Sequence, residues 1–121
     1  MASPIEDLML LGKLREEVKI LNRKFVWHTL DGDEAIAASA TASIFDAITR
    51  PKMEQVEKLA RAIETIDGVP FSSLIKEGET GTALQKAREM ILKWQDSIRE
   101  MIYVEYRKLE DKQARTIEEL S

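Results

Sequence analysis

The chain has 121 residues, of which 44% are hydrophobic and 33% are charged, and its net charge is −4. This length fits one folded domain, and this balance argues against a disordered chain. An acidic chain is a poor candidate for nucleic-acid binding, because phosphate contacts need a basic surface. The absence of cysteine excludes disulfides and thiolate metal sites.

The start of the chain does not resemble a secretory signal. Its short apolar run, residues 8–11, follows the acids Glu6 and Asp7, whereas a signal peptide begins with basic residues and has a longer apolar stretch. Nowhere does an apolar run reach the roughly 18 residues that a membrane-spanning helix needs. We therefore expect a protein of the cytoplasm, with neither membrane nor nucleic acid among its partners.

Residues 13–30 have the composition of a β-hairpin. β-Branched and aromatic side chains, which fit a pleated surface, concentrate on both sides of Asn22 and Arg23. Asn tolerates the left-handed backbone that a tight turn demands. Because an isolated hairpin is marginally stable in water, this one is expected to pack on the helices that follow.

Residues 33–47 are rich in alanine, the strongest helix former, and Asp31 or Asp33 can cap the helix they predict. Their small side chains allow close packing, so we expect this helix to be central.

Residues 50–67 form the clearest short amphipathic pattern. Thr49 can cap the predicted helix, and Pro51 falls in its first turn, where the missing N–H costs nothing. Gly68 can adopt the left-handed conformation that ends a helix. The apolar positions recur at spacings of three and four: Met53, Val56, Leu59, Ala60, Ile63 and Ile66.

Residues 82–118 contain no glycine or proline and begin with Thr82 and Gln85, which have the spacing of a capping box. A single helix of about 36 residues would span roughly 54 Å. A domain of this size has a radius of gyration of only about 14 Å. The predicted helix is therefore too long for its own domain to cover. If the helix is broken, the break is expected at Asp96 and Ser97.

Apolar side chains surround more than half of this helix near residues 101–104. A helix that is apolar on two sides needs cover on two sides, and aromatic residues and methionine are enriched at protein interfaces. We therefore predict a protein-binding surface here, with simple core packing as the alternative. The surface comprises Trp94, Ile98, Met101, Ile102, Tyr103, Tyr106 and Leu109.

No catalytic, cofactor-binding or metal-binding residue is predicted. His28 is the single histidine and has no second histidine or cysteine to share a metal, so a packing role is favoured. Residues 31–34 lack the ligand spacing of a calcium loop. Residues 78–82 lack the glycine spacing and the lysine of a phosphate-binding loop, and the neighbouring acid Glu77 would repel phosphate.

Three segments in order along the chain resemble small tail-assembly proteins of tailed bacteriophages, namely tail assembly chaperones and baseplate-hub-related proteins. The segments are residues 11–30, residues 56–70 with Ile-Asp-Gly-Val-Pro at their end, and residues 102–113 with a Tyr-x-x-Leu-Glu pattern. The resemblance implies a short hairpin followed by helices and a non-catalytic role. It also implies that residues 59–68 and 103–109 determine fold and partner contacts.

The expected fold is mainly α (α+β): a single domain with an N-terminal β-hairpin packed on a helical domain and a long C-terminal helix. The expected function is that of a tail assembly chaperone in the host cytoplasm that binds the tape-measure or hub proteins. It would act as a homo-oligomer or in a hetero-complex, through the C-terminal helix. The alternatives are a structural virion component of the tail tip, baseplate or neck, and a host-directed regulatory binding protein. An enzyme ranks last.

Overall fold

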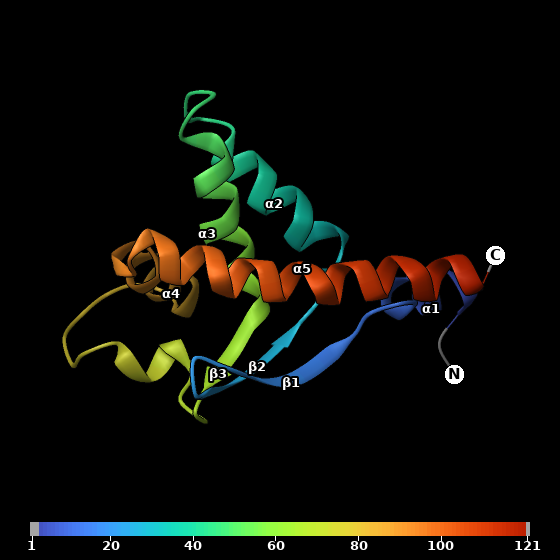
Figure 1. The fold of residues 1–121 in the computed structure, drawn as a ribbon, viewed down its shortest axis with the longest axis horizontal. Coiled ribbons are helices and arrows are strands. Elements are labelled where there is room, and N and C mark those ends of the chain that lie inside the picture. The colour runs from blue at the N-terminus through green and yellow to red at the C-terminus, as the bar shows by residue number, and fades with distance from the viewer. Residues whose placement is uncertain (1–2, 121) are drawn as a thin grey trace.

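Figure 1 shows the computed structural model, which describes residues 3–120 except for the side chains of Met9 and Leu10. Helices dominate, a three-stranded antiparallel sheet lies at one side, and a long helix ends the chain, so the predicted α+β fold class is confirmed. The elements in order are α1 (Pro4–Leu10), β1 (Arg15–Ile20), β2 (Arg23–His28), α2 (Gly32–Ala42), α3 (Arg50–Ala62), β3 (Ile63–Ile66), the 3₁₀ turn η1 (Phe71–Leu74), α4 (Ala83–Lys93) and α5 (Asp96–Glu119).

The predicted hairpin is confirmed, with its turn one residue earlier than expected. β1 pairs with β2 from Arg15 opposite His28 to Ile20 opposite Arg23. The two connecting residues, Leu21 and Asn22, both have positive φ, 51° and 64°. Such a pair matches the twist of the flanking strands, which is why tight hairpins favour it.

The prediction of helix through residue 67 is wrong for its last turn. α3 ends at Ala62, and β3 then pairs antiparallel with β2, with Phe25 opposite Ile66. The β-branched residues 63, 65 and 66 suit a strand, and pairing satisfies the backbone groups of β2 along its second edge. Gly68 has the predicted left-handed backbone, φ 79°, but it follows a strand instead of a helix.

α2 is shorter and more peripheral than predicted. It ends at Ala42 instead of residue 47, and among its apolar residues only Ala38 and Ala42 are buried. Its start follows the sequence signal closely, because Asp31 and Glu34 form a reciprocal capping box. Figure 1 shows α2 lying against the outer side of α3, so the alanine-rich segment does not form the centre of the domain.

The single helix predicted over residues 82–118 is broken. α4 begins with the expected capping box between Thr82 and Gln85 and ends at Lys93. Trp94 and Gln95 have extended backbone, with ψ of 146° and 145°, and α5 begins at Asp96. The break lies just before the favoured position, Asp96 and Ser97. It allows α4 to pack against α3 while α5 turns across the sheet (Figure 1).

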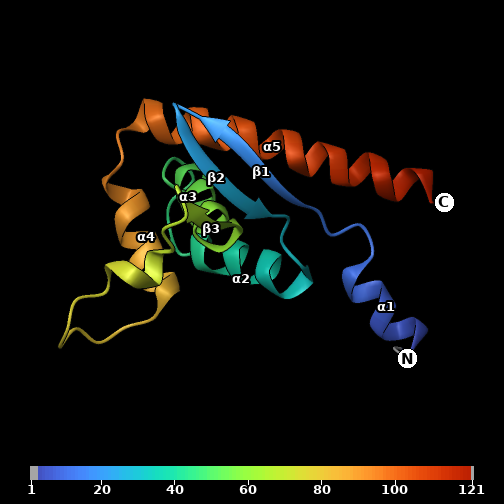
Figure 2. The ribbon, with the colours of Figure 1, turned by 90° about the horizontal axis from the view of Figure 1, so that it is seen from below.

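The core lies between the sheet, α3, α4 and α5. Each of β2, α3, α4 and α5 contributes at least one of the largest fully buried apolar side chains. These side chains are Trp27, Leu59, Val56, Ile91 and Tyr106. The last turns of α5 extend past this core toward α1, as Figures 1 and 2 show. There Gly12 lies so close to the helix that an added Cβ would be 2.7 Å from Ile117 Cγ1.

The hairpin turn offers a stability test. A branched side chain in the left-handed region costs roughly 1–2 kcal/mol, whereas Asn tolerates it. Leu21 is 46% exposed, so its removal gives up little burial. Leu21→Asn should therefore raise the unfolding free energy by about 1 kcal/mol in urea titrations. Leu21→Ala is the matched control: it lacks the short polar side chain that lets Asn hydrogen-bond locally in the left-handed region, and it should give less stabilisation. Equal effects of the two would show that backbone strain is not the cause.

Candidate protein-binding surfaces

The structure places most of the binding residues predicted between positions 94 and 109 in or against the core. Ile102, Tyr106 and Leu109 are at most 3% exposed, so they are core side chains and not an open surface. The partly buried members pack against the same core, and of the seven predicted residues only Met101 is exposed, at 48%. The partly buried members are Trp94, Ile98 and Tyr103. Binding through Met101 stays a prediction.

The burial of α5 centres on Trp27 and Tyr106. Their rings meet edge to face, with centroids 5.5 Å apart at 74°, a preferred geometry for aromatic pairs. Phe25 adds a second ring against Trp27. Trp27 Nε1 donates a hydrogen bond to Glu16 Oε1 at 2.9 Å, which satisfies the indole inside the core. Burial raises the pKa of the Tyr106 phenol well above its ordinary value, so the ring stays neutral.

A buried carboxylate joins α3 to α4. The Glu57 side chain is fully buried and accepts two hydrogen bonds from Arg88, at 2.6 and 2.7 Å, and one from Arg61 at 2.7 Å. Burial by itself raises the pKa of Glu57, but the bonds from Arg88 and Arg61 outweigh it and lower the pKa below its ordinary value. Sequence reasoning missed this group, because Glu57 and Arg88 lie 31 positions apart.

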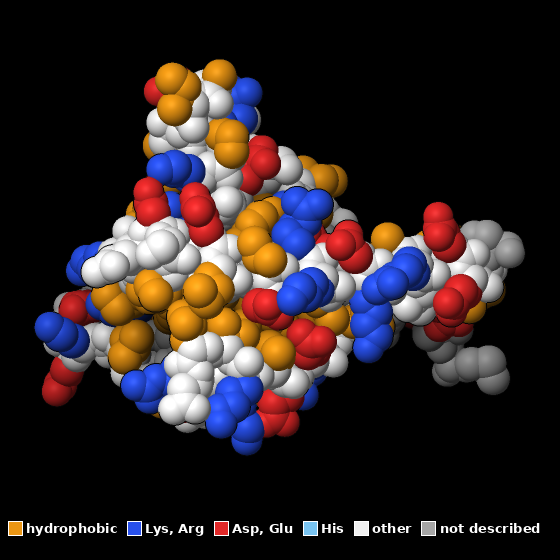
Figure 3. Space-filling view, viewed as in Figure 1, with side chains coloured by type: hydrophobic (Ala, Val, Ile, Leu, Met, Phe, Trp, Pro, Cys, Tyr) orange, Lys and Arg blue, Asp and Glu red, His pale blue; other side chains and the backbone are white. Residues whose placement is uncertain are grey.

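The most exposed part of the α2–α3 pair is its far end, the α2–α3 tip, which we define as residues 43–49. Ile44 and Ile48 are 81% and 87% exposed there. Figure 3 shows hydrophobic side chains gathered at this projecting end. This exposed end was not predicted from the sequence, because the predicted helix 33–47 would have placed Ile44 on a helix face.

Hydrogen bonds within the tip hold these two isoleucines in place. Asp46 Oδ1 accepts from the backbone N–H groups of Ile48 and Thr49, at 3.0 and 2.7 Å. The Thr49 N–H holds the pKa of the Asp46 carboxyl below its usual range. Arg50 donates to the carbonyl of Phe45 at 2.9 Å. Thr49, the predicted cap of α3, makes no side-chain capping bond, and the bonds to Asp46 come from the residues just before the helix.

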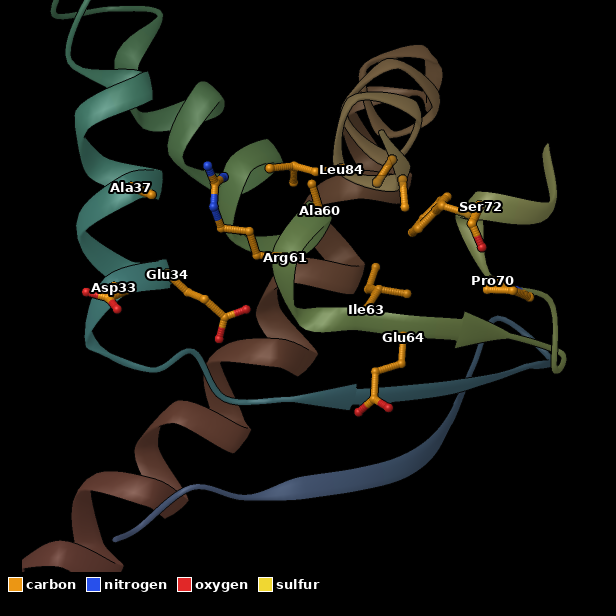
Figure 4. Close-up of a pocket in the computed structure, with 13 residues that line it drawn as sticks. Asp33, Glu34, Ala37, Ala60, Arg61, Ile63, Glu64, Pro70, Ser72 and Leu84 are labelled. Atoms are coloured by element: carbon orange, nitrogen blue, oxygen red, sulfur yellow. The ribbon is translucent and has the colours of Figure 1, made fainter. Parts of the chain in front are cut away.

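An open cavity of about 490 Å³ lies between α2, α3, β3, η1 and α4. Small side chains leave this space, because Ala37, Ala60 and Ala87 face it from three helices. Figure 4 shows acidic side chains on the α2 side, with Leu84 and Ile63 on the other. The remaining lining residues are Asp33, Glu34, Arg61, Glu64, Pro70, Phe71, Ser72 and Ala83.

His28 lies beside this cavity and joins three elements. Its Nδ1 is 3.3 Å from Glu64 Oε2 on β3, and its Nε2 is 3.4 Å from Glu34 Oε2 on α2. Glu64 also accepts from Arg15 on β1. His28 therefore bridges two carboxylates from different elements, and the packing role predicted for it stays a prediction. Within residues 3–120, no group of three or more His, Cys, Asp or Glu residues is placed to hold a metal ion.

Comparison of the chain with protein-family models, with curated proteins and with solved structures finds no match. Among the helices of residues 3–120, none combines the length and the apolar character needed to cross a membrane.

The core position of Tyr106 predicts how a substitution will act. Tyr106→Ala removes a fully buried ring and its contact with Trp27, and should lower the unfolding free energy by about 3–5 kcal/mol. Urea denaturation monitored by Trp fluorescence measures this. Met101→Ala, at the exposed face of the same helix, is the comparison and should cost far less. A folded Tyr106→Ala variant of unchanged stability would contradict the core assignment.

The Glu57 network predicts a dependence of stability on pH. Because the folded pKa of Glu57 lies below its unfolded value of about 4.3, its contribution is complete above that value and is lost as pH falls through the folded pKa. Glu57→Gln should lower the unfolding free energy near pH 7 by about 3–5 kcal/mol, since two arginines lose their charge partner. Its stability should also decline less steeply below about pH 4 than that of the wild type.

Urea titrations between pH 3 and 7 test both statements. Glu100→Gln, an exposed position on α5, is the matched control and should follow the wild-type curve. Parallel pH profiles for Glu57→Gln and the wild type would show that Glu57 does not contribute the acid dependence.

Proposed function

We propose that this chain is a non-catalytic assembly factor that binds another protein through the α2–α3 tip. The observation that carries the proposal is the exposure of Ile44 and Ile48 at the end of a helical pair. Burying a large aliphatic side chain contributes about 1.5–3 kcal/mol, so two such side chains in water favour a partner. Contiguous apolar patches on a folded protein commonly mark binding sites.

The rigidity of the tip supports the same proposal. Asp46 and Arg50 make hydrogen bonds to its backbone, so the main chain that carries the two isoleucines is held before any partner arrives. A preformed contact surface binds with a smaller loss of conformational entropy than a loop that must first be ordered. The exposure of Ile44 and Ile48 is therefore a property of an ordered surface.

The resemblance to tail-assembly proteins of tailed bacteriophages suggests the partner. In this proposal the chain is a tail assembly chaperone that shields apolar helical segments of the tape-measure or hub protein in the host cytoplasm until the tail forms around them. A structural role in the tail tip, baseplate or neck is the alternative. Mass spectrometry of purified particles separates the two, because a chaperone should be absent from them and a structural part present at a fixed copy number.

The tip can be tested by adding charge. Ile44→Asp combined with Ile48→Asp should leave the fold intact, because both side chains are exposed, and should weaken binding to the full-length tape-measure protein encoded by the same genome by at least about a hundredfold. The reason is that a partner would bury two carboxylates without counter-charges. Co-purification after co-expression, followed by calorimetry, measures the loss.

Ile5→Asp is the matched control, since Ile5 is 80% exposed on α1 and lies outside the tip. It should bind as the wild type does, and circular dichroism should show all variants folded. Full binding by the folded tip variant would remove the tip from the interface. Absence of binding by the wild type to tape-measure, hub and baseplate proteins would remove the proposed function.

A further inference from the structure

The open cavity beside α2 has two chemically different sides. Phe71, Leu84 and Ile63 form an apolar side, supplied by η1, α4 and β3. Asp33 and Glu34 stand at the first turn of α2 on the opposite side (Figure 4). A volume of about 490 Å³ falls within the range of sites that bind ligands through an apolar lining with a few polar groups.

The charges around the cavity are unevenly neutralised. Arg61 lines it, but its guanidinium is already bound by the buried Glu57 at 2.7 Å. Glu64 is paired with Arg15 at 3.0 Å. Glu34 Oε1 accepts from the Asp31 backbone N–H at 3.1 Å and its Oε2 lies 3.4 Å from His28, and no Lys or Arg of residues 3–120 pairs with it. The exposed Asp33 likewise has no ion-pair partner among these residues. The α2 side of the cavity is therefore left with an excess of negative charge.

Hydrogen bonds between the surrounding elements hold the shape of the site. The bonds of Glu57 to Arg88 fix α4 against α3, and the capping box of Asp31 and Glu34 fixes the start of α2. The alanines that face the cavity have no longer side chain to extend into it. A ligand thus meets a preformed space, with an apolar side for a bulky group and an acidic edge for a cation.

We propose that this cavity binds a segment of a partner protein in which a bulky apolar side chain stands next to Lys or Arg. The apolar side chain enters between Phe71 and Leu84, and the cation lies against Asp33 and Glu34. This site is separate from the tip, so the inference does not depend on the function proposed above.

Capped dipeptides test the proposal directly by ¹H–¹⁵N NMR titration of the full chain. The probes are acetyl-Phe-Lys-amide, acetyl-Phe-Glu-amide, which carries the opposite charge, and acetyl-Gly-Lys-amide, which lacks the apolar group. The Phe-Lys probe should shift amides that line the cavity, with an affinity at least about fivefold higher than either of the others, because two carboxylates attract one probe and repel another.

Two variants locate the binding. Ala37→Leu places a larger side chain at the cavity wall, where Ala37 is exposed, and should abolish the shifts. Asp33→Lys should remove or reverse the preference for Phe-Lys over Phe-Glu. Asp111→Lys makes the same charge change at an exposed position of α5 that does not line the cavity, and should leave the preference unchanged.

Equal affinity of the wild type for the Phe-Lys and Phe-Glu probes would overturn the proposal, as would shifts confined to residues outside the cavity. Absence of any shift with the Phe-Lys probe up to its solubility would overturn it as well. These outcomes rest on the wild-type chain alone, so they hold even where Ala37→Leu does not fold.

Discussion

The packing of Trp27 against Tyr106 is the interaction on which the other elements depend. A two-stranded hairpin is marginal in water, and a helix of 24 residues such as α5 gains most of its stability from an apolar face that is packed. The hairpin and α5 bury each other's apolar faces, because the Trp27 and Tyr106 rings are both fully buried where they meet. Once α5 lies across the sheet in this way, α3 and α4 close the core from the remaining side (Figure 1).

Features specified within a few residues could be predicted from the sequence. The capping boxes at Asp31 and Thr82 depend only on a side chain three positions later, and the hairpin depends on strand-forming residues around a short turn. Residues 63–66 were different, because two isoleucines three apart with a threonine between them fit a helix stripe as well as a strand. Pairing with β2 decided the outcome, and that partner lies about 40 positions away in the chain.

The break between α4 and α5 has a similar origin. No glycine or proline lies at or next to Trp94 and Gln95. The apolar residues of the segments before and after them follow one continuous helical spacing in the sequence. The reason for the break is global: one straight helix cannot pack against α3 at one end and across the sheet at the other. The spacing of the apolar residues shifts by one position at Ile102, but this shift lies well after Lys93, where α4 ends.

Candidate binding surfaces were harder to predict than the core for a physical reason. An apolar stripe such as residues 94–109 indicates burial, but it carries no information on whether the cover comes from the same chain. The tip appears only because α2 ends at Ala42, which turns Ile44 and Ile48 outward. The cavity needs alanines from three separate helices, and its acidic edge depends on which carboxylates find arginine partners elsewhere.

The tip and the cavity share α2, and this matters for how a long partner would be held and released. α2 leads into the tip at its C-terminal end and forms the acidic edge of the cavity at its first turn. Two proposed sites joined by α2 would act together, because binding at one raises the effective concentration of the partner at the other. A partner that reaches both would be held far more tightly than by either site, yet displacement from one site would return it to weak, fast-exchanging binding. This combination would suit the proposed role of an assembly chaperone, which shields an apolar segment and then releases it.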